Sequence, residues 1–151
     1  MAIPTSIELL IVTPDRLLVH EQVDELQIPG SEGYFGVLPG HMPFLAALSV
    51  GELWYRKGQQ KTYLSIAYGF AEVLPERVTI LAQLAERAED IDVSRAEAAR
   101  KRADERIARG HQAEIDFERA RVAQQKAVVR IQVSSRVSVR SVSSNRTGTQ
   151  G

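Results

Sequence analysis

The sequence predicts a β-rich domain followed by a helical hairpin, and three observations lead to this fold class. Residues 5–85 consist of short apolar runs separated by turn residues. Residues 86–133 are rich in Ala, Arg and Glu, and contain one glycine and no proline. Residues 134–151 are of low sequence complexity. A chain of 151 residues suits one compact domain with an appendage.

The first part of the chain, residues 1–85, is expected to contain the strands. Turn residues separate its apolar runs, as at Thr13-Pro14-Asp15 and at Gly58-Gln59-Gln60. Strands that recur about every 8–12 residues are typical of a sandwich or a barrel. The predicted strands are residues 7–12, 16–20, 23–28, 44–48, 50–55, 62–67, 69–74 and 78–84. A segment of this length can bury a modest core and fold by itself.

Two helices are predicted in residues 86–133. Asp92 is a suitable N-cap for the first helix, and Gly110 is suited to end it. The second helix is expected at residues 113–133, and the short link between the two favours an antiparallel hairpin. Apolar positions recur every three or four residues, at Val93, Ala96, Ala99, Ala103 and Ile107, and then at Phe117, Ala120, Ala123, Ala127 and Ile131.

The hairpin is expected to be the mobile part of the molecule. Alanine stripes bury little apolar area, and isolated helices of this length are only marginally stable in water. Few residues of the final segment, 134–151, are large and apolar. We therefore expect residues 134–151 to be disordered.

Several function classes are excluded by composition and motif. The chain has no cysteine and three scattered histidines, so we expect neither thiol catalysis nor a metal site. No apolar run approaches the roughly 20 residues that span a bilayer, and no signal peptide is recognisable, so a cytosolic location is expected. Walker A, G-x-S-x-G and H-E-x-x-H motifs are missing, so we expect no catalytic site.

Charge is distributed unevenly along the chain. Residues 119–151 carry seven basic side chains and no acidic one, whereas residues 1–118 carry 12 basic and 19 acidic ones. A cationic end of this kind is explained either by an anionic partner or by a solvated tail. Nucleic acid is not the expected partner, because the β part offers no basic groove and no aromatic platform.

Residues 33–44, GYFGVLPGHMPF, resemble the signature of the epsilon subunit of bacterial F-type ATP synthases. Four further segments resemble the same family in the same order: residues 11–16, 68–73, 78–82 and the helical part at 86–133. The resemblance covers about residues 5–133. It implies a ten-stranded β-sandwich of two five-stranded sheets, followed by a two-helix hairpin. It also implies a non-catalytic subunit of the enzyme's rotor.

The resemblance implies that the β-sandwich binds the gamma subunit and the ring of c subunits. It would thereby couple proton flow and rotation to ATP synthesis at the cytoplasmic face of the bacterial membrane, as a peripheral protein attached only through the complex. The loop with Glu32, Tyr34, His41 and Met42 would contact the c-ring. Without the resemblance, the glycines and prolines of this loop only shape a tight turn.

In bacterial members of the family the hairpin inhibits ATP hydrolysis when it is extended. Its basic second helix then meets the alpha and beta subunits. The residues that fit this role by charge and position are Arg119, Arg121, Lys126 and Arg130. The alternative is a basic face that is only solvated.

The segment Ile91-Asp92-Val93-Ser94-Arg95-Ala96 resembles the I/L-D-x-x-R-A motif of ATP-sensing members, those of thermophilic Bacillus-like bacteria. ATP would be a regulatory ligand of the folded hairpin, and no cofactor is required. Lys126 replaces the arginine that such members tend to carry, and it lacks bidentate geometry. The implied ATP site comprises Glu86, Ile91, Asp92, Arg95, Ala96, Arg102, Lys126 and Arg130.

The sequence is therefore compatible with three functional hypotheses. The first is a structural coupling subunit with a regulatory hairpin. The second is primarily an ATP-sensing module. The third is an unrelated β-sandwich adaptor with a coiled hairpin. Independently of these three, the alternative to an ATP site is that Asp92 is only an N-cap and Arg95 only a surface charge.

Overall fold

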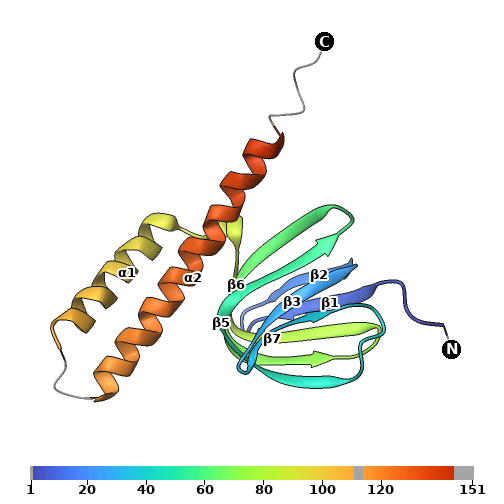
Figure 1. Ribbon diagram of the computed structural model, residues 1–151, viewed down its shortest axis with the longest axis horizontal. Coiled ribbons are helices and arrows are strands. Elements are labelled where there is room, and N and C mark those ends of the chain that lie inside the picture. The colour runs from blue at the N-terminus through green and yellow to red at the C-terminus, as the bar shows by residue number, and fades with distance from the viewer. Residues whose placement is uncertain (1, 111–113, 145–151) are drawn as a thin grey trace, which may run out of the picture. The chain divides into compact units, whose positions relative to one another are not determined.

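The computed structural model describes residues 2–110 and 114–144, and it separates the chain into two compact units, Met1–Arg87 and Ala88–Gly151 (Figure 1). The first is the β unit and the second is the helical unit. The strands of the β unit are β1 (Ile7–Val12), β2 (Leu17–Val23), β3 (Glu25–Gly30), β4 (Gly33–Val37), β5 (Phe44–Lys57), β6 (Gln60–Val73) and β7 (Arg77–Arg87). The helical unit contains η1 (Ala88–Asp90), α1 (Val93–Ala108) and α2 (Glu114–Ser144).

The described part of the β unit is one seven-stranded sheet, with the strand order β2-β1-β7-β6-β5-β3-β4. The prediction of ten strands in two five-stranded sheets is therefore wrong in its strand count. The sequence suggested two strands at 44–48 and 50–55, and two more at 62–67 and 69–74. Each pair is one continuous strand of 14 residues, β5 or β6. Long strands that bend can serve both layers of a sandwich, so fewer strands are needed.

A bend in β6 occurs at Tyr68 and Gly69. Both residues have positive φ angles, 62° and 128°. The register of β6 with β5, and that of β6 with β7, is the same at Ala67 and at Gly69, so the ladder keeps its phase through the bend. A Cβ atom at Gly69 would overlap the Leu81 carbonyl oxygen. Glycine at position 69 therefore permits both the positive φ and the close approach of β7.

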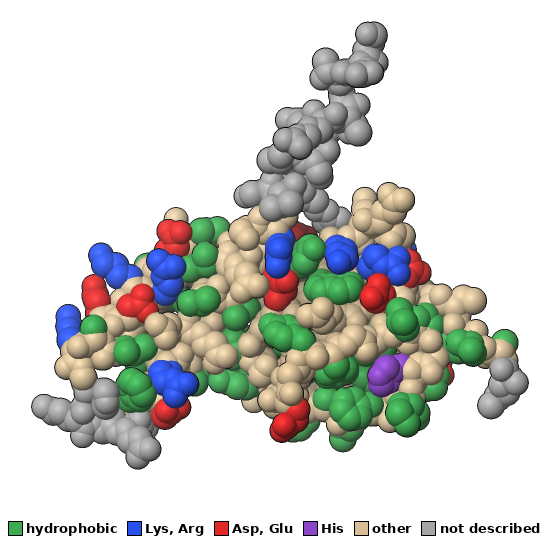
Figure 2. Space-filling view, in the orientation of Figure 1, with side chains coloured by type: hydrophobic (Ala, Val, Ile, Leu, Met, Phe, Trp, Pro, Cys, Tyr) green, Lys and Arg blue, Asp and Glu red, His purple; other side chains and the backbone are tan. Residues whose placement is uncertain are grey.

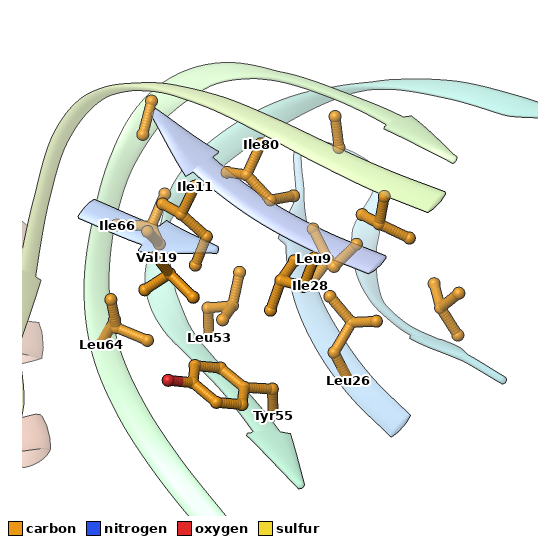
Figure 3. Packing of buried hydrophobic residues seen from close by; sticks show 14 of the residues in the cluster. Leu9, Ile11, Val19, Leu26, Ile28, Leu53, Tyr55, Leu64, Ile66 and Ile80 are labelled. Carbon is orange, nitrogen blue, oxygen red and sulfur yellow. The ribbon is translucent and has the colours of Figure 1, made fainter. Parts of the chain in front are cut away.

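One face of the curved sheet encloses the core (Figure 3). On β1, the buried residues Ile7, Leu9 and Ile11 alternate with partly exposed ones. Full burial of one such side chain contributes roughly 1.5–3 kcal/mol. The other large side chains that are fully buried come from six further strands: Val19, Val23, Leu26, Ile28, Val37, Leu53, Leu64, Ile66 and Ile80.

The ends of α1 confirm two predictions. Asp92 has an extended backbone, and its carboxylate accepts a hydrogen bond from the Arg95 backbone N–H at 3.1 Å. Gly110 has a φ of 71°, and its N–H donates to the Ile107 carbonyl at 3.3 Å. Asp92 is thus the N-cap, and Gly110 is the left-handed residue that follows the last turn.

The two helices form an antiparallel hairpin through small side chains. Ala96 and Ala103 are the buried residues of α1, while Ala120, Ala127 and Val133 are buried on α2. The Gln124 side-chain amide donates to the Asp104 carboxylate at 2.7 Å, which fixes the register of one helix against the other. The linking residues 111 and 112, and the predicted start of the second helix at Ala113, lie outside the described residues.

Helix α2 continues to Ser144, past its predicted end at Val133. Disorder was therefore wrongly predicted for residues 134–144, whereas residues 145–151 lie outside the described part. The hydroxyls of Ser134 and Ser135 donate to the carbonyls of Ile131 and Gln132, at 2.7 and 2.6 Å. Serine bonded in this way is compatible with a helix, and no glycine or proline occurs between Gly110 and Gly148.

Candidate functional site

Part of the predicted docking loop is a strand. Residues 33–37 form β4, which is antiparallel to β3. The paired residues run from Leu26 with Val37 to Gly30 with Gly33. The loop itself comprises residues 38–43, between β4 and β5. The glycines at 33 and 36 suggested a turn throughout, but hydrogen bonding to β3 decides the conformation. Tyr34 therefore lies on an edge strand and not in the loop.

The backbone of loop 38–43 is held at both sides. The Gly40 N–H donates to the Pro75 carbonyl at 2.8 Å, and the His41 N–H donates to the Leu38 carbonyl at 3.2 Å. Gly40 has a φ of 84°, and a Cβ atom there would come within 2.8 Å of the Ile3 side chain. Ile3 therefore lies against this loop and helps to define its surface.

The exposed side chains at this end of the β unit are largely apolar. Ile3, Leu38 and Met42 are 75%, 58% and 73% exposed, and Phe44 is about half-exposed. Phe44 packs edge-on against Phe35, with ring centroids 5.4 Å apart. We call Ile3, Leu38, Met42 and Phe44 the apolar tip. A cluster of this kind on the surface is typical of a protein-binding site.

The predicted c-ring residues do not all meet at the apolar tip. His41 and Met42 lie in loop 38–43, and the His41 Nδ1 atom lies 2.6 Å from the Met42 carbonyl oxygen. Glu32 lies in the turn between β3 and β4, at the opposite end of β4 from this loop. Tyr34 lies between them along β4, so the structure brings two of the four residues together.

A second apolar surface, which the sequence analysis missed, crosses the outer face of the sheet. Its residues are directly opposite one another on five neighbouring strands, so their side chains share one face. Phe70 and Leu81 are 59% and 53% exposed. The members of this apolar row, in order across the sheet, are Ala47, Phe70, Leu81, Val12 and Leu17. Figure 2 shows hydrophobic side chains exposed on one face of the molecule.

The sequence does contain a signal for the apolar row. On β6 the outward residue is Phe70 and the inward one is Ala71, and on β7 Leu81 faces outward and Ala82 inward. A large apolar residue next to a small buried one reverses the usual pattern of a surface strand. The reversal can be recognised only once the inward positions are known.

The predicted ATP residues occupy different environments. Asp92 and Arg95 are exposed and are joined through the cap of α1, while Ile91 and Ala96 are buried and serve packing. Glu86 lies near the end of β7, in the β unit. The other seven residues of the predicted site lie in the helical unit.

Two cations of the predicted ATP site, Arg102 and Lys126, lie at the same position along the length of the hairpin. Asp104 is bonded to Gln124, and in an antiparallel pair Arg102 on α1 is then level with Lys126 on α2. Arg130 lies one turn further along the helix and is half-buried. Lys126 and Arg130 both take part in further interactions within the chain.

The predicted inhibitory residues Arg119 and Arg121 are exposed on α2. Arg121 pairs with Glu118 one turn away at 3.5 Å, and both side chains are exposed. A surface pair of this kind contributes about 0–1 kcal/mol, so it would not keep Arg121 from a partner. Among the described residues, no His, Cys, Asp or Glu side chains form a group that could hold a metal ion. None of the described helices is long and apolar enough to cross a membrane.

Family models match both units of the chain. The beta-sandwich domain of the ATP synthase delta/epsilon chain matches residues 6–88, and its long alpha-helix domain matches residues 89–135. The chain therefore belongs to the family of ATP synthase delta and epsilon chains.

Curated relatives carry the more specific name. The ATP synthase epsilon chain of Nitratidesulfovibrio vulgaris strain DP4 is 48% identical over 128 residues, which cover 85% of this chain and 95% of the relative. The ATP synthase epsilon chain of Syntrophobacter fumaroxidans is 52% identical over 131 residues, covering 87% and 97%. These relatives confirm the resemblance to the epsilon subunit of F-type ATP synthases, which is a non-catalytic subunit.

Solved structures agree with this result. A chain in the Euglena gracilis mitochondrial ATP synthase structure of OSCP, F1 and the c-ring matches with a TM-score of 0.75 and 27% identity, over 84% of this chain and 80% of that one. A chain of the Tetrahymena thermophila mitochondrial ATP synthase central stalk and c-ring has a TM-score of 0.62 at 10% identity, over 85% and 96%. The second match supports the fold alone.

Proposed function

We propose that this epsilon chain couples rotation of the c-subunit ring to ATP synthesis by docking its β unit on both the gamma subunit and the c-ring. The proposed enzyme translocates protons at the bacterial membrane, with this subunit on the cytoplasmic face. The observation that carries the proposal is the presence of two exposed apolar surfaces, the apolar row and the apolar tip, on one well-packed sheet.

The two surfaces have different shapes, which suits two different partners. The apolar row is broad and lies on a pleated sheet face, so it suits a large partner such as the gamma subunit. The apolar tip is small and is formed by a constrained loop, so it suits the short loops of a ring. Both surfaces share strand β5, which begins in the tip at Phe44 and enters the row at Ala47. A sheet with a continuous core can transmit force between them.

Two double substitutions separate the roles of these surfaces. Phe70→Ser with Leu81→Ser should weaken binding of purified gamma subunit at least tenfold, because it removes the exposed apolar area of the row. Leu38→Ser with Met42→Ser should leave gamma binding intact and lower ATP-driven proton pumping by the reconstituted complex. The matched control is Lys57→Ser with Gln59→Ser, at the exposed β5–β6 turn. If both double variants bind gamma and pump protons like the wild type, the proposal is wrong.

The helical unit is proposed to inhibit ATP hydrolysis when α2 extends into the catalytic head. Exposed cations on α2, with no acidic residue after Glu118, suit an acidic surface on the alpha and beta subunits. Deleting residues 88–151 should raise hydrolysis by the reconstituted complex, and Arg119→Ala with Arg121→Ala should raise it partly. Arg100→Ala with Arg106→Ala, two exposed arginines of α1, is the control. Unchanged hydrolysis after the deletion would count against an inhibitory role.

ATP binding to the folded hairpin is a second candidate function. It is favoured by the level register of Arg102 and Lys126 and by the capped start of α1 at Asp92. Cations from both helices would gather the phosphates, and the bound ATP would favour the folded hairpin. Calorimetric titration should show binding by the wild-type chain and weaker binding by Arg95→Ala and Arg130→Ala, with Arg106→Ala as control. Absence of heat at millimolar ATP would exclude the site.

A further inference from the structure

The ladder between β3 and β5 is interrupted at one corner of the sheet. Gln27 pairs with Trp54, and the next paired residues are Gly30 and Leu48. Two residues of β3 therefore lie opposite five residues of β5. Pro29 is one of the two, and it has no N–H to donate. Backbone groups of β5 at this corner consequently need other hydrogen-bonding partners.

Two side chains replace the missing ladder bonds. The Ser49 hydroxyl donates to the Gly30 carbonyl at 3.2 Å. The Glu52 backbone N–H donates to the Tyr34 hydroxyl oxygen at 3.1 Å. Tyr34 belongs to β4, which is not adjacent to β5 in the sheet. Its side chain therefore reaches across β3 to a strand that β4 does not otherwise pair with.

The absence of a side chain at Gly51 provides the space for this contact. Tyr34 is the register partner of Pro29, so its ring starts above the proline. A Cβ atom at Gly51 would come within 2.5 Å of the Tyr34 hydroxyl and within 2.6 Å of Pro29 Cβ. The ring, the proline and the glycine thus fit together at the corner. Tyr34 remains 55% exposed because the contact lies on the outside of the sheet.

We infer that Tyr34 is a positioning residue, whose hydroxyl fastens edge strand β4 across β3 to β5. Among the described strands, β4 pairs only with β3, and it ends at Val37, one residue before the apolar tip begins at Leu38. Fixing β4 therefore fixes one end of loop 38–43. This inference assigns Tyr34 an internal role in place of a direct contact with the c-ring. Its consequence for coupling rests on the proposed docking function.

The hydrogen bond is tested first in the isolated chain by amide hydrogen exchange. Tyr34→Phe keeps the ring and removes the hydroxyl, so exchange of the Glu52 amide should become about fivefold to tenfold faster. Gly51→Ala keeps the hydroxyl and displaces it, so it should have the same effect. Gly36→Ala is the control, because it lies on β4 with open space around its Cβ position. Unchanged Glu52 exchange in both Tyr34→Phe and Gly51→Ala would overturn the inference.

The consequence for coupling is tested in the reconstituted complex. Tyr34→Phe and Gly51→Ala should both lower ATP-driven proton pumping, about twofold to fivefold, while gamma binding stays at the wild-type level. A direct contact of the tyrosine predicts instead that pumping falls without a change in Glu52 exchange. Faster exchange with normal pumping, when Leu38→Ser with Met42→Ser lowers pumping, would overturn the positioning role. Normal pumping in all of these variants would overturn the proposed docking of the apolar tip on the c-ring and leave the hydrogen bond established.

Discussion

The β unit and the helical unit differ in how much apolar surface each of them buries in its own interior. The β unit buries large aliphatic side chains from all seven strands, including Leu9, Ile28 and Ile80 with no exposed area. The buried residues of the helical hairpin are mostly alanines, such as Ala96 and Ala127. At roughly 25 cal/mol per Å² of apolar area, an alanine contributes much less than an isoleucine.

Because of this difference, the β unit is suited to transmitting force and the helical unit to rearrangement. A sheet whose strands are paired and whose core is continuous opens only at high free energy. Two helices joined by alanines and a few side-chain hydrogen bonds can separate at low free energy. The proposed docking function therefore belongs to the β unit, and the proposed regulation belongs to the helical unit. Four predictions test this contrast, in order of decreasing effect.

The largest effect is expected at the bend of β6. Gly69→Ala should lower the free energy of unfolding of the β unit by about 4 kcal/mol, through backbone strain and overlap with Leu81. Urea unfolding followed by circular dichroism measures the change. Gly58→Ala is the control, because its φ is also positive, at 61°, but its Cβ position is open. Equal losses in the two variants would show that close packing at Gly69 is unimportant.

A core truncation should have the next largest effect. Leu53→Ala removes a side chain with no exposed area and should destabilise the β unit by about 3 kcal/mol. Leu45→Ala, at an exposed position of the same strand, should change the free energy of unfolding by less than about 0.5 kcal/mol. The same urea experiment compares the two. A small loss for Leu53→Ala would contradict the picture of a tightly packed β unit.

A change in the helical unit should cost less. Asp92→Ala removes the N-cap of α1 and should destabilise the hairpin by about 1 kcal/mol. The measurement is loss of helical circular dichroism on heating, in the full chain. Asp92→Asn should behave like the wild type, since asparagine caps equally well. A loss as large as that of Leu53→Ala would mean that the hairpin is not the weaker unit.

The smallest effect is expected from Tyr55 at high pH. Burial raises the pKa of the Tyr55 phenol above about 10, while a hydrogen bond with Thr62 acts in the opposite direction. The folded chain then holds this proton more tightly than the unfolded chain. The resulting stability is full below the ordinary pKa of about 10 and is lost as the pH rises through the raised value. Urea unfolding of the wild type should weaken over this range more than that of Tyr55→Phe, and identical pH profiles would contradict the assignment.

Much of the local structure followed from the sequence because its causes are local. Asp92 caps α1 and Gly110 ends it, as their side chains and backbone preferences require. The first strand was predicted with the bounds that the structure gives it, as an apolar run that ends at the turn residues Thr13-Pro14-Asp15. Residues 33–44 resembled the epsilon family strongly enough to indicate the identity of the chain.

Other features depended on contacts between distant residues. Strands β5 and β6 are continuous because each is paired along its length, although the sequence suggested breaks at residues 49 and 68. Residues 33–37 form a strand because β3 offers them hydrogen bonds, although glycines suggested a turn. The continuation of α2 to Ser144 was missed because composition was taken as a sign of disorder.

By itself the sequence determined the two kinds of secondary structure, the ends of α1 and the family. These follow from periodicity, caps and a short motif, which act over a few residues. Only the tertiary structure decided the number of strands, the apolar row and the contact of Tyr34 with β5. Each of these joins residues far apart in the sequence, so it depends on which strands become neighbours and on which face each side chain emerges.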